Sequence, residues 1–114
     1  MSGALNLFKT TLANVTTATT TVYTPPLGYA TVVLLAQVSN TGVSTVEVSA
    51  GINRTTANVA AFTSLINNYS IPMDDAASIL TGRLILQYGD ELQLSASANT
   101  SAQLVLSYLE TLTA

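Results

Sequence analysis

The sequence predicts an all-β protein that folds as an antiparallel β-sandwich, with a jelly roll as one option for its connectivity. Stretches rich in β-branched residues recur at spacings of about 10 residues, and Gly, Pro, Asn or Asp bounds each of them. No stretch keeps the apolar period of an α-helix over several turns. With 114 residues the chain has the size of one domain, so we expect seven or eight short strands around one core.

The first 20 residues differ in composition from the rest of the chain. The run NVTTATTTV consists almost entirely of Thr, Ala and Val, and the stiff β-branched side chains favour an extended backbone. We therefore expect an extended N-terminal arm at residues 1–20, followed by a single β-sandwich domain at residues 21–114. Such an arm could pair with the sheet of a neighbouring subunit.

The segment TVYTPPLGYATVVLLAQVSN contains two predicted strands. Pro25 and Pro26 remove two backbone donors and Gly28 permits a turn, so PPLG separates the strands. The second strand, Ala30 to Val38, is apolar on both faces, which indicates that a second layer or a partner chain covers its outer side. Strict alternation puts the side chains of Val32, Leu34, Ala36 and Val38 on one face and those of Val33 and Leu35 on the other.

The middle of the chain reads as a hairpin followed by a less regular stretch. SNTGVS has the chemistry of a hairpin turn, and TVEVSAGIN after it alternates between apolar and polar residues. Residues Arg54 to Ala61 could form a bulged extension or a surface loop, and we favour a loop followed by a strand at Phe62 to Ile66. The core face of the alternating strand consists of Val46, Val48, Ala50 and Ile52.

Two further turns divide the next part of the sequence. A turn is expected at Pro72 to Ala76, where Asp74 and Asp75 could cap a helical turn. Thr81 to Tyr88 is predicted as a strand, and YGDE as a tight hairpin turn with Gly89 and Asp90 at its centre.

The last two predicted strands differ in pattern. Glu91 to Ala98 alternates, with Leu92, Leu94 and Ala96 directed inward. Ala102 to Leu112 is apolar on both faces and therefore resembles Ala30 to Val38.

The residue inventory excludes most catalytic chemistry. The chain contains neither His nor Cys, which removes the usual bases, thiol nucleophiles and zinc ligands. The adjacent carboxylates Asp74–Asp75 and Asp90–Glu91 lie in predicted turns, where such side chains usually bind backbone amides and face solvent. We therefore expect no enzyme activity and no catalytic, cofactor-binding or metal-ligating residue.

Charge and hydropathy exclude two further classes of partner. The only basic residues, Lys9, Arg54 and Arg83, form no cluster that could neutralise a nucleic-acid backbone. No apolar run approaches the ~20 residues needed to span a bilayer. MSGALNLFKTTLANV also lacks the pattern of a secretory signal, so we expect synthesis in the cytoplasm.

The low charge points instead to protein partners. Only 8% of the residues are charged, against about 25% in ordinary soluble domains. A surface with so little charge repulsion suits a subunit that contacts other subunits, so we expect a homo-oligomer, a dimer or trimer.

The tyrosines leave a carbohydrate-binding module as one alternative, because aromatic faces stack on sugars. The chain has no Trp, however, and its five Tyr residues are spread along the sequence. We expect Tyr23, Tyr29, Tyr88 and Tyr108 to pack their rings in the core with their hydroxyls at its edge.

Three segments in this order resemble small virion proteins of tailed bacteriophages, including cyanophages. An opening of the form "tvYt.P.G", a hairpin "L..GDel.v.A" and a closing "LS.lE" recur in that group over almost the whole chain. The matching residues are Tyr23, Pro26 and Gly28 in the first segment, Leu86, Gly89 and Asp90 in the second, and Leu106, Ser107 and Glu110 in the third.

The resemblance implies a structural protein of the virion, present in the host cytoplasm during assembly. Its implied role is a capsid decoration (cement) protein that binds the major capsid protein of the assembled head. A neck, tail or fibre-attachment protein is the alternative within the same group.

Overall fold

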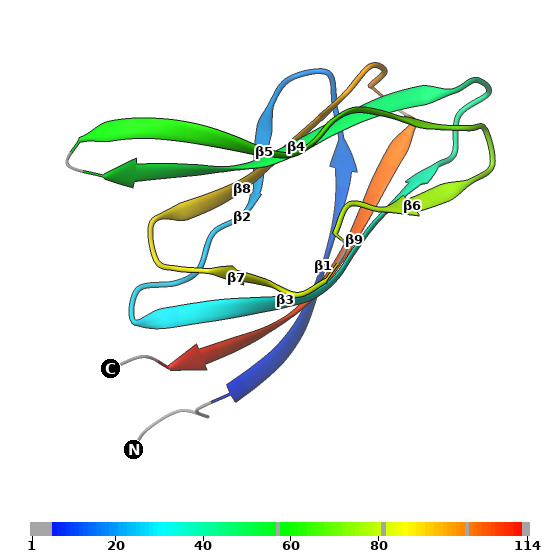
Figure 1. Ribbon diagram of the computed structural model, residues 1–114. Coiled ribbons are helices and arrows are strands. Elements are labelled where there is room, and N and C mark those ends of the chain that lie inside the picture. The colour runs from blue at the N-terminus through cyan, green and yellow to red at the C-terminus, as the bar shows by residue number, and fades with distance from the viewer. Residues whose placement is uncertain (1–5, 57, 81, 100, 113–114) are drawn as a thin grey trace.

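The computed structural model describes residues 6–56, 58–80, 82–99 and 101–112, and these residues form a β-sandwich of two antiparallel sheets (Figure 1). The first sheet has the order β1-β9-β3-β6, with β7 also paired to β3, and the second has the order β2-β8-β4-β5. No helix long and apolar enough to cross a membrane occurs in this part of the chain. The strands are β1 (Asn6–Val15), β2 (Thr20–Tyr23), β3 (Tyr29–Asn40), β4 (Val46–Thr56), β5 (Val59–Ile71), β6 (Ala76–Ser78), β7 (Leu84–Leu86), β8 (Asp90–Ala96) and β9 (Ala102–Leu112).

The connectivity is that of a jelly roll. β1 pairs with β9, β2 with β8, β3 with β6 and β7, and β4 with β5. The strands of the first half therefore pair with those of the second half in reverse order, as in one long hairpin. Folding this hairpin across itself places β1, β3, β6, β7 and β9 in one sheet and β2, β4, β5 and β8 in the other, which is the double-sheet arrangement of jelly rolls.

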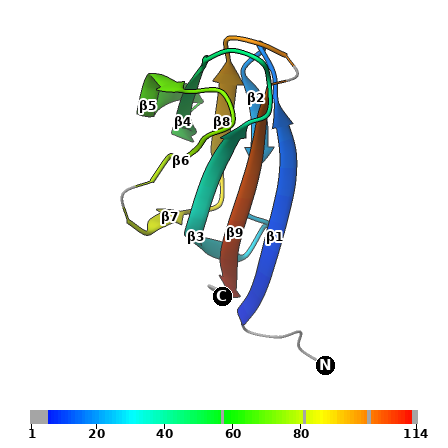
Figure 2. The same cartoon turned by 90° about the vertical axis from the view of Figure 1, so that its right-hand side faces the viewer.

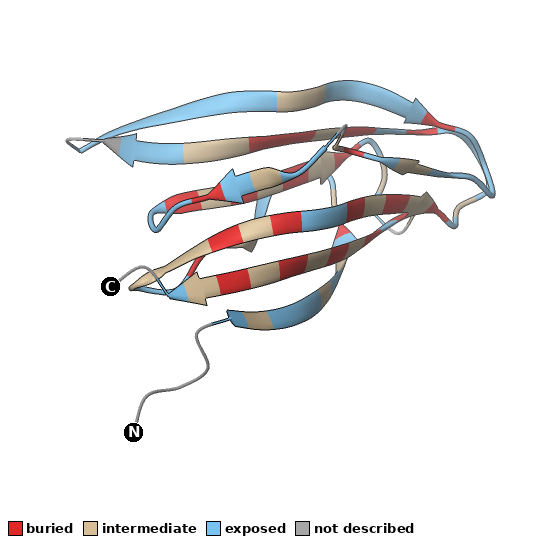
Figure 3. Ribbon diagram, turned by 60° about the horizontal axis from the view of Figure 1, so that its bottom comes forward, coloured by how far each residue is buried: buried red, intermediate tan, exposed pale blue. Residues whose placement is uncertain are grey.

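The core lies between the sheets and follows the alternation of the strands. β8 is buried at every second residue, and Leu92, Leu94 and Ala96 point inward as predicted. β9 shows the same period from Ala102 to Glu110, visible as regular bands in Figure 3. Val46, Val48 and Ala50 complete the core from β4, with Ile52 partly buried at its edge.

The predicted N-terminal arm contains a strand of the domain itself. Asn6–Val15 is extended as expected, but it pairs along its whole length with β9 of the same chain. Val15 is fully buried in the core. Thr20 belongs to β2 in the other sheet, and residues 1–5 lie outside the described residues.

The turns at SNTGVS and YGDE were both predicted to form hairpins. Both predictions are wrong, because the chain changes sheet at each turn. The turn after β3 leads to β4 in the opposite sheet, and the turn after β7 leads to β8 in the opposite sheet. Turn chemistry identifies a reversal of the chain, but it does not determine whether the next strand pairs with the previous one. The central residues of the second turn are Tyr88 and Gly89, since the Asp90 amide donates to the Gln87 carbonyl.

A β-bulge changes the predicted faces of β3. The pairing of β3 with β9 shifts between Val33 and Leu35, so Leu34 is the extra residue. Val33, Ala36 and Val38 are therefore buried, whereas Val32 is only partly covered. Strict alternation had placed Val32 with Ala36 and Val38, which the bulge contradicts.

Three predicted boundaries also differ from the structure. Arg54 to Ala61 is mainly strand, because β4 runs on to Thr56 and β5 begins at Val59. In the region predicted as a strand at Thr81 to Tyr88, only Leu84–Leu86 is one, and Thr81 lies outside the described residues. The turn near Pro72 leads into β6 without a helical turn.

Three tight turns share one backbone geometry. The amides of Tyr29, Asp75 and Asp90 donate to the carbonyls three residues earlier. The third residue of each turn has a positive φ, which is the signature of a type II turn. These residues are Gly28 (φ 85°), Asp74 (φ 62°) and Gly89 (φ 96°).

Candidate interaction surfaces

The outer face of the first sheet carries rows of apolar side chains that continue across its strands. Phe8 of β1 lies opposite Leu109 of β9, Leu109 opposite Val32 of β3, and Val32 opposite Ile85 of β7. The inward positions of the same strands fill the core, so this row points outward. Phe8 and Ile85 are 76% and 62% exposed. One side of the sandwich therefore presents an apolar row to solvent.

Two further rows extend this face. Leu12 lies opposite Val105, with Gln37 beyond it, and Thr10 lies opposite Ser107, with Leu35 beyond it. The Thr10 and Ser107 hydroxyls lie 3.3 Å apart. We call the outward apolar residues of this sheet the apolar face; they are Phe8, Leu12, Val32, Leu35, Ile85, Val105 and Leu109.

The apolar face carries no charge at any outward position of its paired strands. The outward polar residues among which the apolar face lies are all neutral. Figure 2 turns this side of the molecule toward the viewer. The outward polar residues are Asn6, Thr10, Asn14, Gln37, Ser39, Ser78, Gln103, Ser107 and Thr111.

The outer face of the second sheet is mainly polar by contrast, although it also carries Phe62, which is half-exposed. The Gln93 amide donates to the Thr21 hydroxyl, and the Asn53 amide donates to Glu91. Ser49 bonds with the Asn68 backbone at the bulge in β5. The two outer faces therefore differ in chemistry, which suits them to different surroundings.

The β4–β5 hairpin extends past the end of the second sheet (Figure 1). The last contact of β4 with β8 pairs Arg54 with Asp90, whereas Thr55 and Thr56 pair only with β5. The outer edge of β5 has no neighbouring strand in the described chain. Its backbone can therefore accept another strand.

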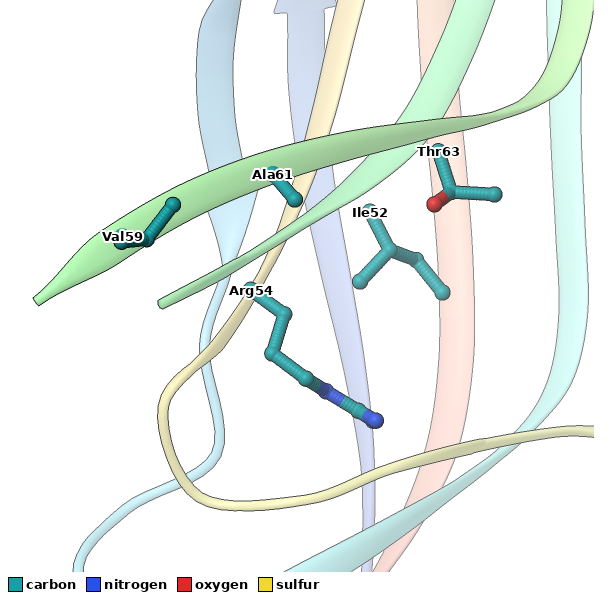
Figure 4. Close-up of a pocket in the computed structure, with 5 residues that line it drawn as sticks. All are labelled: Ile52, Arg54, Val59, Ala61 and Thr63. Atoms are coloured by element: carbon teal, nitrogen blue, oxygen red, sulfur yellow. The ribbon is translucent and has the colours of Figure 1, made fainter. Parts of the chain in front are cut away.

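An apolar pocket of about 420 Å³ lies on the inner side of this hairpin. Figure 4 shows its lining side chains, which come only from β4 and β5. Val59 is 66% exposed at its rim, and the Arg54 guanidinium forms one wall. The lining residues are Ile52, Arg54, Val59, Ala61 and Thr63.

The Arg54 side chain is held in place by a buried carboxylate. Arg54 donates from Nε and Nη2 to the two carboxylate oxygens of Asp90, at 2.5 and 2.7 Å. The Gln87 amide also donates to Asp90, at 2.9 Å. These bonds, the one from Arg54 above all, hold the pKa of Asp90 below its ordinary value. Asp90 does bind a backbone amide as predicted, but it is only 1% exposed, so the expectation that it faces solvent is wrong.

A second buried carboxylate, that of Glu110 near the end of the chain, bonds with two residues near its beginning. Glu110 accepts from the Tyr23 hydroxyl at 2.6 Å and pairs with the Lys9 ammonium at 2.9 Å. Since a phenol has one proton, the Thr31 hydroxyl donates to the Tyr23 oxygen, 2.7 Å away. The Tyr23 ring packs on Tyr108, with centroids 4.4 Å apart. This cluster links β1, β2, β3 and β9 at one end of the sandwich.

The remaining candidates occupy ordinary structural positions. Asp75 accepts from the adjacent Ala76 amide, and the described residues contain no group of three potential metal-ligating side chains. Tyr23 and Tyr108 pack at the edge of the core as predicted. Tyr88 is largely exposed, which contradicts the prediction for it.

The apolar face and the hairpin pocket were not identified as sites from the sequence. The apolar residues on both sides of β3 and β9 were the available signal, and they did predict a second face in need of cover. The row of Phe8, Leu109, Val32 and Ile85 depends on pairing between distant strands, which no local pattern specifies.

No protein-family model matches the sequence, and no curated protein matches it. Solved structures with a similar fold do exist. A chain in the crystal structure of the T13 IBDV viral particle matches with a TM-score of 0.57 and 11% identity, over 97% of this chain and 32% of that chain. A chain in the acid-stable capsid of Helicobacter pylori bacteriophage KHP30 matches with a TM-score of 0.56 and 12% identity, over 97% of this chain and 90% of that chain. The present chain thus spans about a third of the first and nearly all of the second, and it shares their fold.

Proposed function

We propose that this chain is a non-enzymatic structural protein of a phage virion that decorates and stabilises the assembled head. The observation that carries the proposal is the match to a chain of the KHP30 capsid over nearly the full length of both chains. A fold alone does not determine function, because jelly rolls also serve as lectins and enzymes. The low charge and the two apolar surfaces described above favour a role in assembly.

The size of the chain favours decoration of a shell over construction of one. In the IBDV particle the matching region is 32% of a longer chain, whereas the KHP30 chain is little more than this fold. The present sandwich measures 50 × 31 × 22 Å and has one core. A unit of this kind suits binding across subunits that are already assembled, so that its binding energy stabilises the shell.

We assign the contact with the major capsid protein to the β4–β5 hairpin. The free edge of β5 can pair with an extended segment of the shell, and the adjacent pocket can take an apolar side chain of that segment. Arg54 keeps its charge neutralised by Asp90 in this arrangement. The contact is therefore made by backbone hydrogen bonds and apolar burial.

The proposal is tested by adding purified protein to heads of the encoding virus that were assembled without it. We expect the wild-type protein to bind and to raise the temperature at which the heads rupture. Val59→Asp puts a charge at the rim of the pocket and should abolish both effects. Val43→Asp is the matched control, since Val43 is 90% exposed in the turn after β3, and it should bind like the wild type.

Two results would contradict the proposal. Wild-type protein that does not bind the heads, or binds without raising the rupture temperature, would exclude a cement role. If Val43→Asp fails as completely as Val59→Asp, the hairpin is not the contact. Both variants must keep the far-ultraviolet circular dichroism of the wild type for these comparisons to count.

A further inference from the structure

We propose that the apolar face is a homodimer interface, on which a second copy of this chain packs sheet against sheet across a two-fold axis. This inference goes beyond the proposed function, because it concerns self-association of the free protein, before it binds a capsid. It rests on the chemistry, the area and the position of the face.

The chemistry of the face suits a copy of itself. An interface between identical surfaces brings each side chain close to its own kind, so that charged residues near the axis would repel. The outward positions of β1, β9, β3, β6 and β7 carry none. Two charged residues lie close by. Lys9 is at an inward position of β1 and pairs with Glu110. Arg83, which precedes β7, lines a separate pocket with Leu65, Ile66 and Tyr69 of β5.

The apolar rows also match themselves. A two-fold axis that lies in the interface along the row from Phe8 to Ile85 places each residue of the row against its symmetry mate. The strands of the two copies then run close to antiparallel, and the normal sheet twist sets the angle at which sheets pack. Phe8 and Ile85, the most exposed members, become covered at the two ends of the row.

The area of the face is sufficient for a stable dimer. Ten residues of strand at about 3.3 Å and four strand positions at about 4.8 Å span a face of about 600 Å². Two such faces bury roughly 1,200 Å² or more, which is the lower end of the range for specific interfaces. The apolar row at its centre supplies the well-packed core that such an interface needs.

The position of the face leaves the hairpin free. β4 and β5 belong to the opposite sheet (Figure 2), and the residues that line the pocket come only from these two strands (Figure 4). A dimer formed through the first sheet would therefore display two hairpins, one from each copy.

The test compares two lysine variants by sedimentation velocity over the micromolar range. We expect a wild-type dimer. Leu109→Lys, on the apolar face, should raise the dissociation constant by at least about 100-fold, equivalent to about 2.8 kcal/mol. Gln93 lies outward on the opposite sheet, where its side-chain amide donates to the Thr21 hydroxyl. Gln93→Lys should leave the dimer intact. Val105→Lys repeats the test on a neighbouring row in case Leu109→Lys does not fold.

Several outcomes would overturn the inference. A wild-type monomer throughout this range would do so, as would a trimer, because a two-fold interface closes at two copies. A dimer unaffected by both Leu109→Lys and Val105→Lys would indicate pairing through a free strand edge. A wild-type monomer that binds heads and loses that binding on Leu109→Lys would assign the apolar face to the shell. The sedimentation results do not depend on whether the protein is a decoration protein.

Discussion

At the scale of single residues, two buried carboxylates bind side chains of other strands, and both lie at the same end of the sandwich. Asp90 joins β8 to β4 through Arg54, and Glu110 joins β9 to β2 through Tyr23. A buried carboxylate needs partners, because removing its charge from water is costly unless hydrogen bonds replace the water. Both side chains are buried, and their contacts hold strands together.

Asp90→Asn should lower the free energy of unfolding by about 1–3 kcal/mol near pH 7, since the charged bond to Arg54 is lost while the side chain stays buried. Urea denaturation followed by circular dichroism measures this. Asp74→Asn is the control: Asp74 is exposed at positive φ, which Asn tolerates, and it should change little.

The Asp90–Arg54 pair predicts that the protein loses stability in acid. The pKa of Asp90 is lower in the folded chain than its ordinary value of 3.8, so its stabilising effect is present above that value. It is lost as the pH falls below about 4. The stability difference between wild type and Asp90→Asn should therefore shrink in acid, and a constant difference down to about pH 2 would contradict this origin.

Tyr23 predicts that the protein loses stability at alkaline pH. Burial first, and the bond to Glu110 second, raise the pKa of its phenol well above 10. The unfolded chain then releases the Tyr23 proton at lower pH than the folded chain, so stability falls as the pH rises above about 10. Tyr23→Phe should be less stable at neutral pH and should show a smaller further loss between roughly pH 9 and pH 11. An equal alkaline loss in both proteins would rule out Tyr23 as its source.

At the scale of strands, local sequence patterns predicted the regular strands. They failed where pairing between distant strands determines which residues face the core. The alternation of β8 and of the first half of β4 was read correctly from the sequence, because each has one buried face. The faces of β3 were misread, because its bulge at Leu34 is produced by pairing with β9. Arg54–Ala61 was misread as a loop because Thr, Ala and Asn do not distinguish an exposed hairpin from irregular chain.

Gly51 lies in β4 where the neighbouring strand β5 leaves no room for a side chain. A Cβ there would overlap the Phe62 ring and lie 2.5 Å from the Thr63 carbonyl oxygen. Gly51→Ala should therefore destabilise the protein by about 1–3 kcal/mol. Because the carbonyl remains, adding Phe62→Ala should restore little of the loss. Gly82→Ala, where nothing lies within 4 Å of the new atom, is the control and should be close to neutral.

At the scale of the whole molecule, the distribution of charge separates the surfaces. The acidic side chains of Glu47 and Glu91 lie on the outer side of the second sheet, and the apolar face has no charge at all. The assembly surfaces proposed above therefore depend on apolar burial and backbone pairing, which predicts how they respond to salt.

Self-association and binding to heads should both persist at high ionic strength. Raising the salt from roughly 0.1 M to 1 M shortens the Debye length from about 10 Å to 3 Å and weakens exposed charge pairs. The dissociation constants should change by no more than a few-fold, or fall as apolar burial strengthens. A loss of binding by a factor of about 100 would mean that charged contacts dominate.

The copy number of the chain in purified virions tests the decoration role most directly. Quantitative mass spectrometry, with the major capsid protein as the internal standard, gives the ratio of the two chains in intact particles. A decoration protein should be present in a fixed ratio to the major capsid protein, as one copy for each capsid subunit or each small cluster of subunits. A chain confined to the few copies that a neck or tail requires, or absent from the particle, would contradict the decoration role.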